Sequence, residues 1–156
     1  MIIELGTMVR FPFLLIAMCS FGARAQELTG VQHATAMGFE FAIPEGWVGA
    51  RAEGGYVIGH MTIPGAILLS ANHHTDLDAM VRTFSEPTND GNSALEAVGP
   101  PEMIADSTVK VVQSGTIDGT PVKVIGIAKL HPRNGNTANL LALAPTDAFG
   151  PELEAA

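Results

Sequence analysis

The stretch TVKVVQSGTIDGTPVKVIGIAKL, residues 108–130, constrains the fold more than any other part of the chain. Both halves are rich in β-branched residues, and the second half alternates apolar with polar or small residues. Between the halves lies Asp118-Gly119, a dipeptide that favours two-residue hairpin turns. The sequence therefore predicts a long antiparallel hairpin made of strands 108–117 and 120–130.

Further strand patterns lie on both sides of this hairpin. After it, a polar loop at 131–136 leads to a predicted strand at 138–143 and a short closing helix at 148–154. That helix has little length before Ala156, which leaves open that the chain is truncated. Before the hairpin, four β-rich runs at short spacing predict an antiparallel meander. The runs cover residues 38–43, 47–48, 56–63 and 66–72.

Between the meander and the hairpin the hydrophobic period changes. Leu77, Met80, Val81 and Phe84 follow helical spacing, so residues 75–84 are predicted to form an amphipathic helix. Its N-terminus would be capped by Thr75, with acidic residues in the first turn. A short strand is expected at 95–98, before the turn residues Gly99-Pro100-Pro101.

This order of elements predicts an α+β fold in which helices pack on an antiparallel sheet, an α/β/α sandwich with a short C-terminal helix. Residues 38–156 form the single predicted domain, and residues 26–37 an extended lead-in.

The N-terminus has the pattern of a cleavable export signal. Arg10 precedes the apolar run FPFLLIAMC at 11–19, and Ala23-Arg24-Ala25 supplies the small residues that signal peptidase requires. The run is well short of the roughly 20 residues that cross a bilayer, so no stable membrane anchor is predicted after cleavage. Residues 1–25 are therefore assigned as a signal peptide, with either Met1 or Met8 as the start. The predicted location is the periplasm or the extracellular space.

Cleavage would change the composition of the chain. The full sequence has 8 Lys+Arg and 16 Asp+Glu, and residues 1–25 hold Arg10, Arg24 and Glu4. The remaining chain keeps 6 basic and 15 acidic residues, a net charge of −9. Nucleic acid is a poor partner for such a chain, because its recognition requires a basic surface. The single cysteine, Cys19, would leave with the signal, so no disulfide or thiol chemistry is predicted.

The segment Gly38-Phe39-Glu40-Phe41-Ala42-Ile43-Pro44-Glu45-Gly46-Trp47 resembles the opening strand and turn of PsbP-like α/β/α sandwich proteins. The hairpin turn at 118–121 and residues 141–145 resemble the second half of bacterial exported members of that superfamily. The resemblance covers roughly residues 37–150, and it is a pattern of strands and turns. It implies a binding or assembly factor rather than an enzyme, although fold alone does not determine function.

One polar cluster could hold a divalent metal ion. His73, His74, Asp76 and Asp78 lie close together where a strand meets a helix, and His60 or His131 could assist. Imidazole and carboxylate groups are ligands for Zn²⁺ and similar ions. Adjacent histidines on a strand point to opposite faces, however, and helix capping also explains the two aspartates. A hydrolytic metal site near His74 and Asp78 is the alternative hypothesis.

Three other residues are candidates for ligand binding. Trp47 and Tyr56 could contact a partner through their rings, although a Trp after Pro-x-Gly often packs over a turn instead. Arg133 lies in a polar loop and could meet an anionic group. Four methionines, at 37, 61, 80 and 103, could line an apolar groove.

The sequence thus favours an exported, non-enzymatic binding or assembly module. Its partner is predicted to be a protein or small molecule of the cell envelope. No cofactor and no catalytic residue are predicted.

Overall fold

The computed structural model describes residues 27–156. The predicted signal peptide, including the cleavage residues Ala23 and Ala25, lies outside the described residues. The elements, in chain order, are β1 (Gly30–Ala34), β2 (Phe39–Ile43), β3 (Trp47–Ala52), β4 (Gly55–His60), β5 (Ala66–His73), α1 (Leu77–Ser85), β6 (Thr88–Asn89), β7 (Ser93–Ala97), β8 (Glu102–Ala105), β9 (Thr108–Ile117), β10 (Thr120–Leu130), β11 (Asn136–Pro145) and α2 (Pro151–Ala155).

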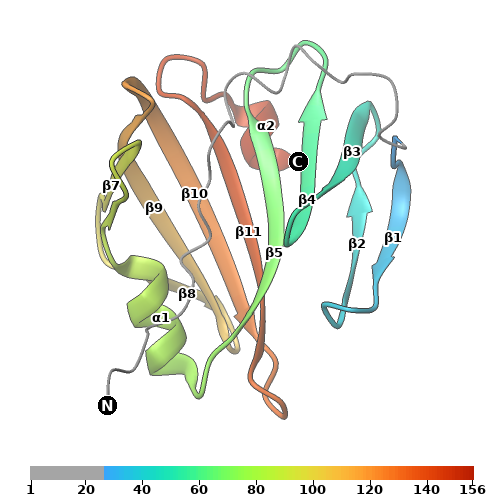
Figure 1. Cartoon of the computed structure of the whole chain (residues 1–156), viewed down its shortest axis with the longest axis vertical. Helices are drawn as coiled ribbons and strands as arrows, with labels where there is room; N and C mark the ends of the chain where they lie inside the picture. The colour runs from blue at the N-terminus through green and yellow to red at the C-terminus, as the bar shows by residue number, and fades with distance from the viewer. Residues whose placement is uncertain (1–26) are drawn as a thin grey trace.

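These strands form one large antiparallel sheet and a small two-stranded sheet beside it (Figure 1). The strands of the large sheet run in the order β3-β4-β5-β11-β10-β9-β7-β6, and β8 also pairs with β9. The fold is α+β, as predicted, and most of it is antiparallel sheet.

The predicted long hairpin is confirmed as β9 and β10, which pair from Thr120↔Ile117 to Lys129↔Thr108. Asp118 and Gly119 have φ angles of 49° and 77°. Both therefore lie in the left-handed region that a two-residue hairpin turn requires. On the other side of β10 lies β11, which extends two residues further at each end than the predicted strand 138–143.

The predicted four-strand meander is correct for only three of its strands. β3, β4 and β5 are consecutive neighbours in the large sheet. β2 instead pairs with β1, so the segment 26–37, predicted as a lead-in, contains a strand. β2 also packs its aromatic side chains onto the large sheet, where the ring of Phe41 lies 4.8 Å from that of Tyr56.

The N-terminal half of β5 is covered on both faces, as its continuous apolar sequence predicts. Residues 66–69 are all buried. Ile67 and Leu69 belong to a core cluster that includes Trp47, whereas Leu68 packs with Val122 on the opposite face.

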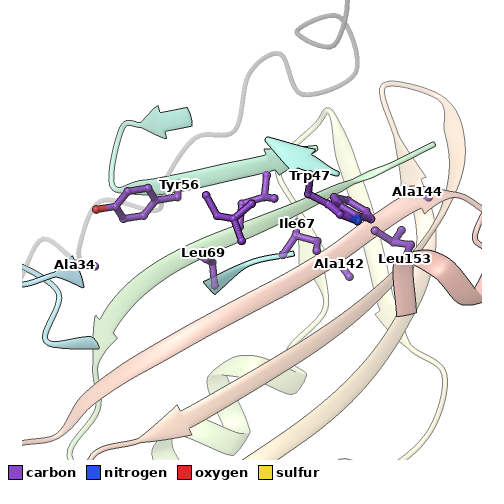
Figure 2. Packing of buried hydrophobic residues seen from close by; sticks show 10 residues of the cluster. Ala34, Trp47, Tyr56, Ile67, Leu69, Ala142, Ala144 and Leu153 are labelled. Carbon is purple, nitrogen blue, oxygen red and sulfur yellow. The ribbon is translucent and has the colours of Figure 1, made fainter. Parts of the chain in front are cut away.

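The two helices lie on opposite faces of the large sheet. Met80 of α1 is fully buried against Ala128, which pairs with Asn139 of β11. Leu153 of α2 is 1 % exposed and packs in the cluster that contains Ala142. Residues 139 and 142 are three apart on one strand, so their side chains point to opposite faces. Figure 2 shows Leu153 gathered with Trp47, Ile67, Ala142 and Ala144.

Candidate functional site

The His-Asp segment predicted as a metal site forms the junction between β5 and α1. The helix begins at Leu77, and its N-cap is Asp76 rather than the predicted Thr75. The Ala79 N–H donates to Oδ1 of Asp76 at 2.8 Å, and the Thr75 hydroxyl donates to Oδ2 at 3.1 Å. These hydrogen bonds lower the pKa of the Asp76 carboxyl, and the bond from Ala79 has the larger effect of the two. Asp76 therefore has a structural role as an ionised cap.

His74 is tied to the neighbouring strand. Its Nδ1 lies 2.8 Å from the hydroxyl of Thr137, a buried residue of β11, and its backbone N–H donates to the Gly135 carbonyl at 2.9 Å. Burial lowers the pKa of His74, and the nearby His73 lowers it further. The lowered pKa favours the neutral imidazole, which pairs with Thr137 of β11, while the backbone N–H of His74 holds the β10–β11 loop.

The two histidines proposed to assist a metal are also engaged by the backbone. Nδ1 of His60 accepts from the N–H of Thr62 at 3.1 Å and of Ile63 at 3.2 Å, and Nδ1 of His131 accepts from the N–H of Arg133 at 3.3 Å. Within residues 27–156, no three His, Cys, Asp or Glu side chains are grouped so that they could hold a metal ion.

The two aromatic candidates for ligand binding are core residues. Trp47 and Tyr56 are 5 % and 7 % exposed, and the Trp47 ring lies 5.4 Å from the His60 ring. The guanidinium of Arg51 lies 5.9 Å from the centre of the Tyr56 ring. Little of either aromatic surface is accessible to a partner. Arg133 is exposed in the β10–β11 loop, as predicted.

The four methionines do not share a groove. Met37 packs against the core cluster that contains Trp47, whereas Met80, a residue of α1, is buried on the other face of the sheet. Met61 and Met103 are both exposed.

Exposed apolar side chains are concentrated at one edge of the sheet. Every residue from 96 to 106 is exposed. Five large apolar side chains are exposed in the described part of the chain, and three of them fall within seven residues. They are Val98 at 65 %, Met103 at 50 % and Ile104 at 45 %. We call residues 98–104 the apolar edge.

The apolar edge runs along the outer side of β9. β7 pairs with the C-terminal half of β9 and β8 with its N-terminal half, while residues 98–101 connect them. β8 has β9 as its only strand partner among the described residues, so its other side is open. A free strand edge offers unpaired backbone groups to another chain.

A surface hollow lies on each side of this edge. One, of 290 Å³, is lined by Val98, Pro100, Glu102 and Val112, among others. The other, of 560 Å³, is lined by Met103, Ile104 and Leu77 of α1, among others. Glu102 pairs with Lys110 and Met103 pairs with Val109, so the two hollows lie on opposite faces of the sheet.

The chain around the apolar edge is acidic. Five carboxylates and no lysine or arginine lie between Arg82 and Lys110. They are Glu86, Asp90, Glu96, Glu102 and Asp106. The ammonium of Lys110 lies 3.7 Å from the Glu154 carboxylate, which offsets its charge.

Sequence reasoning identified part of this surface. It named Met103, a strand near 95–98 and the turn at 99–101, but it missed strand β8 and the role of Ile104. The available signal was the apolar pair Met103-Ile104 between two carboxylates and next to Pro100-Pro101, a combination that does not suit a core strand.

No family model matches this chain, and no curated protein matches it. Within residues 27–156, no helix has the length and apolar character needed to span a membrane.

Proposed function

We propose that this chain is an exported, non-enzymatic binding or assembly module, and that it binds its partner through the apolar edge. The observation that carries the proposal is that Val98, Met103 and Ile104 are all exposed within seven residues, with Met103 and Ile104 in a strand whose outer edge is open. Exposed apolar patches on small domains mark interaction surfaces, because water exposure of such side chains is unfavourable.

Two further features support this proposal. The signal pattern at residues 1–25 favours a location in the periplasm or outside the cell, where a partner would be a component of the cell envelope. The placement of α1 and α2 on opposite faces of one antiparallel sheet supports a PsbP-like α/β/α sandwich, whose members are mostly binding or assembly factors.

Affinity capture with matched variants tests the proposal. The full chain, tagged and expressed in its own host, is compared with the double variant Met103→Asp/Ile104→Asp and with the control Met61→Asp. Met61 is 96 % exposed but lies outside the apolar edge, so its replacement introduces the same chemistry elsewhere. We call the double variant the edge variant. The amount of partner protein recovered with it should fall at least about tenfold, because central apolar contacts dominate protein interfaces.

Thermal unfolding of the variants provides the structural control. All replaced side chains are exposed, so the melting temperatures should stay within a few degrees of the parent. Recovery of the same proteins in the same amounts by the edge variant and by Met61→Asp would contradict the proposal.

A further inference from the structure

We infer that the partner segment is an extended peptide with alternating apolar side chains and lysine or arginine at its ends. This inference rests on the proposed function, because it describes what the apolar edge would bind. Three features of the edge carry it: the placement of the hollows, the charge around them and the irregularity of the strand.

The hollows determine the conformation of the segment. Because they lie on opposite faces of the sheet, a segment alongside β8 reaches both only if successive side chains point to alternate sides. An extended strand does this by its geometry. Recognition of this kind combines main-chain hydrogen bonds with hollows for side chains on each face.

The carboxylates determine the charge of the segment. Glu102 lines one hollow together with Lys110, whose ammonium lies 3.7 Å from the Glu154 carboxylate, and Asp106 lines the other hollow. Basic residues at the two ends of a bound segment would meet these carboxylates, and charge complementarity of this kind guides both encounter and register. A second copy of this chain is disfavoured as the occupant, since its β8 carries the same carboxylates and would place like charges together.

The strand itself limits which segments can bind. Pro100 and Pro101 precede β8, and the pairing with β9 shifts between Met103 and Ala105, which leaves Ile104 as a bulge. Prolines, bulges and charged residues protect strand edges from indiscriminate pairing. Only a few main-chain hydrogen bonds can therefore form between β8 and a bound segment. The choice among segments then depends on the apolar side chains and the flanking charges.

Three labelled peptides test the inference by fluorescence anisotropy on the protein purified from its own envelope fraction. The first alternates valine and threonine and carries two lysines at each end. The second replaces the lysines with glutamates, and the third keeps the lysines but groups the valines together. We expect the first to bind at least about tenfold more tightly than either of the others. Its affinity should fall as salt is raised.

Variants link this binding to the edge. Ile104→Asp should lower the affinity for the first peptide at least about tenfold, whereas Met61→Asp should leave that affinity unchanged. Equal affinity of the lysine and glutamate peptides, equal affinity of the alternating and grouped peptides, or binding unaffected by Ile104→Asp would each overturn the inference.

The affinity captures with the edge variant distinguish a failure of this inference from a failure of the proposed function. If the edge variant loses its natural partners while no peptide binds, the description of the segment is wrong and the proposed function stands. If the edge variant keeps its partners and no peptide binds, both are wrong. A dimer in sedimentation analysis that Ile104→Asp dissociates would also overturn the inference, because the occupant would be a second copy.

Discussion

Replacement of Leu153 by alanine is expected to lower the free energy of unfolding by about 2–5 kcal/mol. Leu153 is 1 % exposed, although it belongs to a helix of only five residues. It packs in the core cluster with Ile67 and Ala142, and its Cδ2 atom lies 2.8 Å from the position that a Cβ on Gly65 would occupy. Its removal therefore leaves a cavity between α2, the sheet and the β4–β5 turn. Urea denaturation measures the loss.

The neighbouring Glu152→Ala is the matched control. Glu152 is exposed in the same short helix, so its replacement should change the free energy of unfolding by less than about 0.5 kcal/mol. If Leu153→Ala is equally mild, α2 does not close the core and this part of the described packing is wrong.

Replacement of Gly55 by alanine is expected to cost about 3 kcal/mol of stability. A Cβ on Gly55 would lie 1.9 Å from the backbone carbonyl oxygen of Leu69, so it fits only if β4 and β5 move apart. Tyr56 and Leu69 pair across the same two strands and are both buried, so this movement would also loosen the core. Chemical denaturation of the purified chain measures the effect.

Gly54→Ala separates backbone strain from crowding. Gly54 has a φ of 75°, but no atom lies within 4 Å of the position of its Cβ. An alanine there should cost only about 1–2 kcal/mol, the penalty of the left-handed conformation. A larger loss at Gly54 than at Gly55 would contradict the described approach of β4 and β5.

The parts of the fold that depend on local chemistry could be predicted from the sequence. The β9–β10 hairpin follows from alternation and from Asp118-Gly119, whose φ angles are those the turn requires. Helix α1 follows from helical spacing, and Met80 is buried as that spacing demands. The N-cap was missed by one residue, because Thr75 and Asp76 are both good capping residues and only the backbone conformation distinguishes them.

The features that depend on distant contacts could not be predicted. The sequence of β2 shows that it is a half-buried strand but not that its partner is β1, since alternation within one strand carries no information about which segment pairs with it. An aromatic residue beside a turn can face the core or a partner, and Trp47 faces the core. Strand β8 has no alternating pattern, and its pairing comes from the length of β9 that β7 leaves free.

The most direct test of the apolar edge as a binding surface is site-specific photocrosslinking in the intact envelope of the native host. Full chains carrying Met103→p-benzoylphenylalanine or Met61→p-benzoylphenylalanine are irradiated, and the products are separated by mass. The account predicts a discrete adduct to another protein from position 103 and none from position 61, although both side chains are exposed. The same adducts from both positions, or adducts from position 61 alone, would contradict it.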